Sequence, residues 1–144
     1  MKNKVVELDQ ALAAFKDGQT ILFADWHGEI SAEEIITGLI EKGVKDITAV
    51  GVSGGMPDQG LGRMIVNHQI KKLLTTHIGL NPVAKEQYVA GELDVEFIPQ
   101  GTFTERIRCA GYGLGGCLTP TGVGTAVAEG KQILNLNGKD YLLE

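Results

Sequence analysis

The chain has 144 residues, of which 43% are hydrophobic and 22% are charged, and its formal net charge is −5. This length suits one domain over residues 1–144, because domains usually hold roughly 100–200 residues. The negative charge, with no dense basic stripe to offset it, argues against nucleic acid as a partner. No apolar run approaches the ~20 residues that cross a membrane, so we expect no membrane partner.

The N-terminal stretch MKNKVVELDQ lacks the apolar core of a signal peptide. The two cysteines, Cys109 and Cys117, are not spaced as a redox or zinc motif. We therefore expect reduced thiols and a cytoplasmic location. Glycine, with 20 residues, is about twice as frequent as its usual ~7%. Such glycine clusters are typical of backbone that must approach something closely.

Helical and strand patterns alternate from the start of the chain. Residues 8–15 have helical spacing, and residues 19–24 form a short apolar run that predicts a buried strand. Ser31 predicts a helix N-cap, with Glu34 completing a capping box. The apolar stripe of this helix is Ile35, Ile36, Leu39 and Ile40. Gly43 is typical of a residue that ends a helix.

The alternation continues to the end of the chain. The predicted elements are a strand over residues 46–52, a loop over 53–62, a short helix over 63–70, a strand over 71–79, a helix over 82–90, a strand over 94–99 and a helix over 102–111. Asn81 is expected to cap the helix that begins at Pro82. Asn137 and Gly138 separate two alternating runs, which predicts a β-hairpin over residues 132–144.

Buried strands that alternate with helices indicate an α/β domain. We expect an open, mainly parallel sheet with flanking helices and a C-terminal β-hairpin. Ligands of such sheets bind outside the carboxyl ends of the strands. The segments expected there are residues 25–30, 53–62 and 100–102.

The stretch GVSGG places Ser53 in a G-x-S-x-G pattern after a predicted strand. A nucleophile elbow also needs a helix directly afterwards, whereas two glycines and Pro57 follow here. His68 and His77 lie downstream, in or near predicted core elements. A serine hydrolase is therefore the least favoured of the functions that we consider.

Asp25, His27 and Glu29 alternate along the chain, so on an extended segment they would face one side and could ligate a metal. No fourth ligand and no H-E-x-x-H spacing accompany them. We prefer a polar pocket rim and expect no metal site. The glycine clusters fit no Walker or dinucleotide spacing, which leaves nicotinamide binding without support.

The string PQGTFTERIRCAGYGLGGCLTPTGVGT, residues 99–125, resembles the A (alpha) subunit of the class I, 3-oxoacid type CoA-transferases. The likeness extends through VKDITAV, GLGRMI, GELDVEFIPQGT, VAEGK and NGKDYLLE. It implies an open α/β fold and a B (beta) subunit as partner, usually in an α2β2 heterotetramer. The implied reaction moves CoA between short-chain acids such as acetoacetate, acetate and butyrate. CoA is then a substrate, and no permanently bound cofactor is expected.

The resemblance also implies where the chemistry resides. A glutamate of the beta subunit attacks the acyl-CoA carbonyl, and an anhydride and then an enzyme-CoA thioester follow. Such a carboxylate, with a reference pKa near 4.3, is ionised at neutral pH and needs no base. The carbonyl oxygen gains charge and needs fixed donors. Gln100 matches the family's PQGT glutamine, which is implicated in the active site; the other reading is a loop glutamine that bonds backbone. Ser53 is a weaker catalytic candidate.

The family's first loop reads GGF-x-x-x-G-x-P and contacts CoA, but only its aromatic residue survives here, as Trp26. The candidate CoA-binding residues are Ala24, Asp25, Trp26, His27, Gly28, Glu29, Ile30, Gly54, Gly55 and Gly101. We interpret the loop as a pocket rim with an altered ligand preference. Because family A subunits continue past the matching YLLE, we expect a fragment, a shortened subunit, or a partner that completes the core. The alternative function is a non-catalytic module of the same fold that binds acyl groups or sugar phosphates.

Overall fold

The structure is a computed structural model that describes residues 4–24 and 26–144. The chain divides into two compact units, Met1–Glu96 and Phe97–Glu144, which we call unit 1 and unit 2. The expectation of one domain over residues 1–144 stays a prediction. Among the described residues, no helix has the length and apolar character that a membrane-spanning segment needs.

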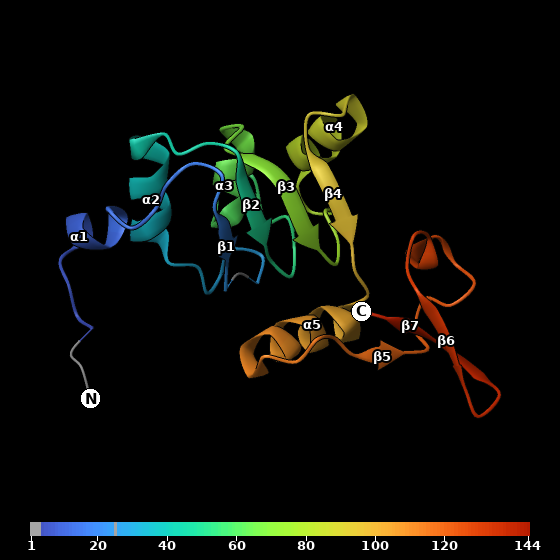
Figure 1. Cartoon of the computed structure of the whole chain (residues 1–144). Helices are drawn as coiled ribbons and strands as arrows, with labels where there is room; N and C mark the ends of the chain where they lie inside the picture. The colour runs from blue at the N-terminus through green and yellow to red at the C-terminus, as the bar shows by residue number, and fades with distance from the viewer. Residues whose placement is uncertain (1–3, 25) are drawn as a thin grey trace. The chain divides into compact units, whose positions relative to one another are not determined.

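A four-stranded sheet with the order β1-β2-β3-β4 forms the centre of unit 1 (Figure 1). Its strands are β1 (Thr20–Leu22), β2 (Ile47–Val50), β3 (Ile70–Thr75) and β4 (Asp94–Phe97). β2 pairs in parallel with β1 on one side and with β3 on the other, so that Ala49 lies opposite both Ile21 and Leu73. The predicted α/β class with a parallel sheet is confirmed.

Among the described residues, one helix precedes the strands of unit 1, and three helices connect them in chain order. They are α1 (Leu8–Leu12), α2 (Glu33–Lys42), α3 (Leu61–Val66) and α4 (Pro82–Ala90). Because consecutive parallel strands are joined by right-handed crossovers, α2, α3 and α4 cover one face of the sheet. The core between the helices and this face includes Ile36, Leu39, Ile47, Ala49, Leu61, Met64, Ile65 and Leu73. Thr48 and Val50, which alternate with the buried residues of β2, are only half-buried.

The helix predicted after Ser31 exists, but its predicted N-cap is wrong. α2 begins at Glu33 after Ala32, with no side-chain cap, and the enclosed Ser31 hydroxyl has no hydrogen-bond partner within the described part of the chain. The reason is local geometry: Ser31 belongs to a turn in which its N–H donates to the carbonyl of Gly28, at 3.4 Å. The C-terminal prediction is confirmed, because Gly43 has the left-handed φ of 69°.

The strand predicted over residues 19–24 exists, but the expectation that it is buried is wrong. β1 is the edge strand of the sheet, and Leu22 is 57% exposed. A short apolar run cannot by itself distinguish a central strand from an edge strand. The prediction for α4 is confirmed, since it begins at Pro82 and the Asn81 side chain accepts a hydrogen bond from the N–H of Ala84.

Unit 2 contains one long helix and a small antiparallel sheet with the order β5-β7-β6. Its elements are α5 (Gln100–Tyr112), β5 (Leu118–Thr119), a 3-10 helix η1 (Ala126–Ala128), β6 (Ile133–Leu136) and β7 (Lys139–Leu143). The predicted hairpin is confirmed. Asn137 and Gly138 have φ values of 53° and 78°, as a two-residue turn with both central residues left-handed requires.

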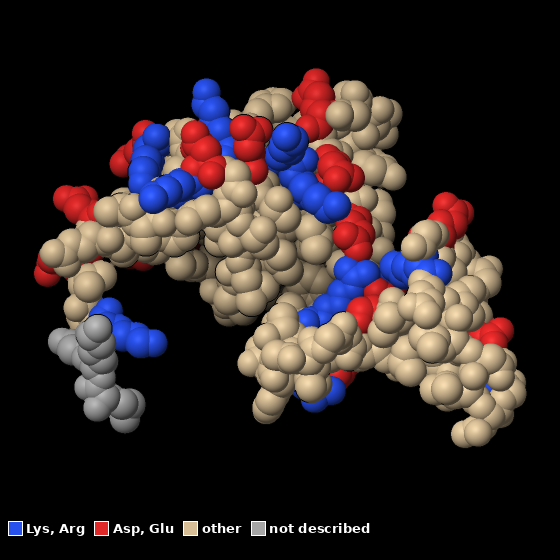
Figure 2. All heavy atoms as spheres, viewed as in Figure 1, with Lys and Arg blue, Asp and Glu red and all other residues tan. Residues whose placement is uncertain are grey.

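Acidic and basic side chains are interspersed on the face of the molecule that Figure 2 shows. In unit 1, for example, the Lys72 ammonium lies 3.4 Å from the carboxylate of Asp94 and 4.0 Å from that of Glu96. Mixed charge of this kind does not build the one-sign field that steers polyanions to a surface.

Candidate functional site

The loops that follow β2 and β3 are joined at the carboxyl end of the sheet in unit 1. Ser53 and His77 form an isolated parallel β-bridge, and the N–H of Gly54 donates to the carbonyl of His77 at 3.0 Å. The hydroxyl of Thr76 donates to the carbonyl of Val52 at 2.6 Å. One of the three segments predicted at the ligand-binding edge, residues 53–62, is thus fixed to the residues that follow β3.

Asn81 holds this glycine loop from the start of α4. Its side chain is fully buried, and its Nδ2 group donates to the carbonyl of Gly54 at 3.0 Å. Its Oδ1 atom accepts from the N–H of Ala84 at 3.1 Å, which caps α4. The sequence pattern identified the cap but gave no sign of the contact with Gly54. Asn81 therefore couples a helix start to the backbone of a candidate site residue.

Ser53 is 1% exposed, and its hydroxyl oxygen accepts a hydrogen bond from the N–H of Gly55 at 3.2 Å. The nearby His77 uses its Nδ1 atom on the Thr76 hydroxyl, at 3.0 Å. Among the described residues no histidine hydrogen-bonds Ser53, and the next helix begins only at Leu61. The arrangement lacks the base and the strand–turn–helix context of a serine nucleophile. A catalytic role for Ser53 stays a prediction.

The first loop brings Trp26 and His27 against His77. The ring centroids of Trp26 and His27 are 4.7 Å apart, and those of His27 and His77 are 5.8 Å apart, both in edge-to-face geometry. His27 has a left-handed φ of 58°, and its enclosed Nδ1 atom has no hydrogen-bond partner among the residues that the structure describes. Strained backbone and orphaned polar atoms tend to gather at functional sites. No sequence pattern pointed to His77 as a member of this cluster.

The metal-site hypothesis assumed that residues 25–29 are extended, and this assumption is wrong for the described residues 26–29. Residues 27–30 form a turn, in which the N–H of Glu29 donates to the carbonyl of Trp26 at 3.0 Å. Side chains at alternate positions therefore do not share a face there. Asp25 itself lies outside the described residues. In the described part of the chain, no group of three or more His, Cys, Asp or Glu side chains is placed to hold a metal.

Gly28 allows the turn to pack on its neighbour. It has a φ of 100°, and a side chain at this position would overlap with the side chain of Gln59. The glycine therefore satisfies both a backbone conformation and a close approach. Gly54 and Gly55 are likewise buried: Gly54 packs against Ile78, and Gly55 packs against the backbone of Gln59 and Gly62.

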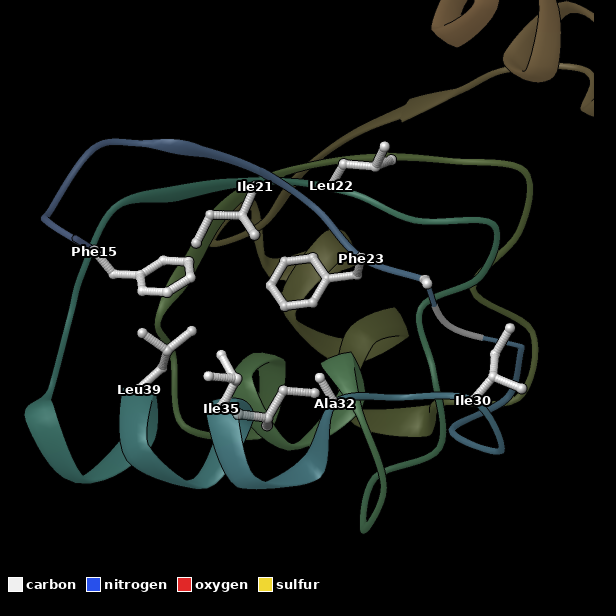
Figure 3. Close-up of a pocket in the computed structure, with 10 residues that line it drawn as sticks. Phe15, Ile21, Leu22, Phe23, Ile30, Ala32, Ile35 and Leu39 are labelled. Carbon is white, nitrogen blue, oxygen red and sulfur yellow. The ribbon is translucent and has the colours of Figure 1, made fainter. Parts of the chain in front are cut away.

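An apolar pocket of about 300 Å³ lies between β1 and α2 in unit 1 (Figure 3). Its lining consists of Phe15, Ile21, Leu22, Phe23, Ala24, Ile30, Ala32, Ile35, Ile36 and Leu39. Ala24 and Ile30, two of the candidate CoA-binding residues, thus contribute to an apolar wall. The described residues that line this pocket all have apolar side chains, so this lining can enclose hydrocarbon and offers no group that transfers a proton.

Gln100 is the first residue of α5, after Pro99, and it is exposed. The Phe103 N–H makes the first turn by donating to the carbonyl of Pro99 at 2.8 Å. Within the described residues the Gln100 side-chain amide has no hydrogen-bond partner, and the choice between its two expected roles stays a prediction. Gly101 beside it has open space where a side chain would stand. Gln100 and Gly101 belong to unit 2, whereas the other candidates belong to unit 1.

The family described as Coenzyme A transferase matches residues 5–144. The chain belongs to the coenzyme A transferase family. This finding confirms the resemblance that the block of residues 99–125 indicated, and it covers both units of the transferase chain.

Three relatives of the transferase chain are named as alpha subunits. It is 46% identical over its whole length to the acetate CoA-transferase subunit alpha of Escherichia coli K12, and it covers 66% of that protein. It is 43% identical to a probable coenzyme A transferase subunit alpha of Bacillus subtilis, covering 98% of this chain and 62% of the relative. It is 39% identical to the acetoacetyl-CoA:acetate/butyrate CoA transferase alpha subunit of Clostridium acetobutylicum, covering 100% and 66%. The chain thus spans about two thirds of the length of these relatives.

Solved structures agree on the fold of the transferase chain. An acyl-CoA transferase from E. coli O157:H7, in a thioester complex with CoA, matches with a TM-score of 0.81 and 19% identity, over 96% of this chain and 31% of that one. A decarboxylase, AibA/AibB, matches with a TM-score of 0.79 and 16% identity, over 96% and 56%. Because one fold carries both activities, the fold does not by itself assign a reaction.

Proposed function

We propose that this chain is the alpha subunit of a CoA-transferase that moves CoA between short-chain carboxylic or 3-oxo acids of the acetoacetate, acetate and butyrate class. The names of the similar alpha subunits support the activity and the substrate class. The partner is a beta subunit, in an α2β2 assembly, located in the cytoplasm. CoA is a substrate in this proposal, and the chain carries no permanently bound cofactor.

The attacking glutamate belongs to the beta subunit. Its carboxylate adds to the acyl-CoA carbonyl, and expulsion of the CoA thiolate leaves a mixed anhydride. The thiolate then attacks the glutamyl carbonyl of the anhydride, which releases the first acid and leaves a glutamyl-CoA thioester. The second acid reverses these steps. At each addition a carbonyl oxygen becomes negatively charged and needs a hydrogen-bond donor that is already in place.

The observation that carries the proposal is the free amide of Gln100. It stands at the N-terminus of the 13-residue helix α5, where unpaired backbone N–H groups and the helix dipole favour negative charge. A neutral amide can donate to an oxyanion without forming an ion pair with the nucleophilic carboxylate. We assign Gln100 this donor role, with Gly101 leaving room for the substrate.

The test uses this chain co-expressed with its beta-type partner, assayed for CoA exchange between acetyl-CoA and a panel of short acids. We expect Gln100→Ala to lower kcat by about 10²–10³-fold, as loss of one oxyanion donor does. Gln132→Ala, an exposed glutamine of the same unit, is the matched control and should leave kcat unchanged. Unchanged turnover in a correctly assembled Gln100→Ala enzyme would remove the assigned role.

The alternative function is a non-catalytic module that binds acyl groups or sugar phosphates. It predicts a different result for the co-expressed pair. It requires ligand binding with no CoA exchange for any acid of the panel. Exchange by the co-expressed pair excludes this alternative.

A further inference from the structure

We infer that His27 and His77 form a binding site for one hydroxyl group of a ligand, at the carboxyl end of the sheet in unit 1. A hydroxyl can donate one hydrogen bond and accept another, and the two imidazoles offer one acceptor and one donor. The inference rests on the proposed function only for the source of the hydroxyl, which is either a hydroxy acid or CoA itself.

The acceptor is on His77. The Thr76 hydroxyl has one proton, which it donates to the carbonyl of Val52 at 2.6 Å. The same oxygen lies 3.0 Å from Nδ1 of His77, so it accepts the Nδ1 proton of that ring. In the neutral imidazole the other nitrogen, Nε2, is then a lone-pair acceptor. Thr76 therefore positions His77 in one tautomer.

The donor is on His27. Its Nδ1 atom is enclosed and has no partner among the described residues, and an enclosed N–H that lacks an acceptor is costly. The neutral ring therefore carries its proton on Nε2. A carboxylate or carbonyl oxygen can accept a hydrogen bond from Nε2 of His27, but it has no proton to donate to the lone pair on Nε2 of His77. A hydroxyl oxygen satisfies both rings.

The spacing of the rings fits one shared oxygen. An oxygen that hydrogen-bonds a ring nitrogen lies about 4 Å from the centroid of that imidazole. The centroids of His27 and His77 are 5.8 Å apart. Half of this separation, 2.9 Å, is shorter than the distance of about 4 Å, so one oxygen can lie within hydrogen-bond distance of both rings. The left-handed backbone of His27 holds its ring in this position, which is a strain that a ligand contact would explain.

Trp26 makes the site directly measurable. It is the sole tryptophan of the chain, it is 45% exposed, and its ring centroid lies 4.7 Å from that of His27. A ligand that engages His27 should therefore change the fluorescence of Trp26. The readout needs neither CoA exchange nor a partner subunit.

The experiment titrates the full chain with 3-hydroxybutyrate, butyrate and pantetheine while recording Trp26 emission. We expect saturable binding of 3-hydroxybutyrate or of pantetheine, and at least tenfold weaker binding of butyrate, which lacks the hydroxyl. A response to 3-hydroxybutyrate identifies the acid as the source, and a response to pantetheine alone identifies CoA. His27→Gln and His77→Gln should each weaken binding at least tenfold. His68→Gln, which changes the third histidine of the chain, should not.

A second pair of variants separates positioning from folding. Thr76→Val removes the acceptor for the His77 ring and should weaken binding at least tenfold, whereas Thr76→Ser keeps the hydroxyl and should restore it. Two results would overturn the inference. One is equal binding of butyrate and 3-hydroxybutyrate with no response to pantetheine. The other is ligand binding that the His27 and His77 variants leave unchanged. If the co-expressed pair exchanges CoA but the chain binds no hydroxyl ligand, only the inferred hydroxyl site is contradicted. If the chain binds the hydroxyl ligand but the co-expressed pair exchanges no CoA, only the proposed function is contradicted.

Discussion

The Nζ atom of Lys131 lies 2.6 Å from Oε1 of Glu144, whose side chain is completely buried. Arg106 of α5 binds the other carboxylate oxygen, with its Nε atom at 2.8 Å. Glu144 also exchanges two backbone hydrogen bonds of 2.8 Å with Cys117. Glu144 therefore joins three segments of unit 2: its carboxylate binds α5 and the segment before β6, and its backbone binds the segment before β5.

Replacing this carboxylate should destabilise unit 2. Glu144→Gln removes the negative charge that Arg106 and Lys131 both contact, at a position where the Glu144 side chain is completely buried. We expect a loss of about 3–5 kcal/mol in the free energy of unfolding, as when one partner of a buried ion pair is removed. Urea titrations that follow β7 amide signals in NMR spectra provide the measurement. Glu129→Gln, at an exposed position, is the control and should cost less than about 0.5 kcal/mol.

The same carboxylate should make unit 2 sensitive to acid. Burial alone raises the pKa of Glu144, but the hydrogen bonds and charges of Lys131 and Arg106 outweigh it, so the folded pKa lies below the ordinary 4.5. A lowered folded pKa contributes stability that is complete above the unfolded value and is lost as pH falls through the folded value. Between pH 6 and pH 3 the wild-type unfolding free energy should therefore fall more than that of Glu144→Gln. Parallel pH curves for the two proteins would contradict the buried charge.

Gly62 at the start of α3 should not tolerate a side chain. A methyl group there would overlap with the carbonyl oxygen of Met56. Because the neighbour is backbone, the loop must move, and we expect Gly62→Ala to cost about 1–3 kcal/mol. Urea unfolding monitored by Trp26 fluorescence reports this loss in unit 1.

Gly111 is the matched control for that substitution. It lies inside α5 with open space where a side chain would stand. Gly111→Ala should stabilise the helix by about 0.5–1 kcal/mol, because alanine loses less backbone entropy than glycine. A destabilising Gly111→Ala would show that the space around α5 is occupied in solution.

Asn81 should matter for stability more than an ordinary helix cap does. Asn81→Ala removes the cap on Ala84 and leaves the buried carbonyl of Gly54 without its donor. We expect a loss of about 2–4 kcal/mol, against about 1 for a cap alone. Asn67→Ala is the control, since Asn67 is exposed and bonds only the carbonyl of Arg63. Equal effects of the two substitutions on the urea midpoint would mean that the contact with Gly54 contributes nothing.

Local chemistry explains why much of the fold could be predicted from the sequence. Asn81 with Pro82 specifies a helix start, and Asn137 with Gly138 specifies a turn whose two residues need positive φ. The capping box at Ser31 failed because the turn from Gly28 competes for the same backbone. β1 was mistaken for a buried strand, since its edge position depends on which strands pair and not on its own residues.

The candidate site could be predicted only in part. Gln100 and the first loop were identified by resemblance, and their roles stay predictions. The partnership of His27 with His77 was not foreseen, because the two histidines are 50 positions apart and meet only through the crossover from β1 to β3. Thr76 gave no signal at all, since a threonine at a strand end is typical of β-structure.

The most direct test of the division of labour between subunits compares two preparations in one assay. CoA exchange between acetyl-CoA and acetoacetate is measured for these 144 residues alone and for the chain co-purified with its beta-type partner. We expect no exchange above background from the chain alone, because the proposed function places the attacking carboxylate on the partner. The assembled pair should show full turnover. Full turnover by the 144 residues without a partner would contradict that division.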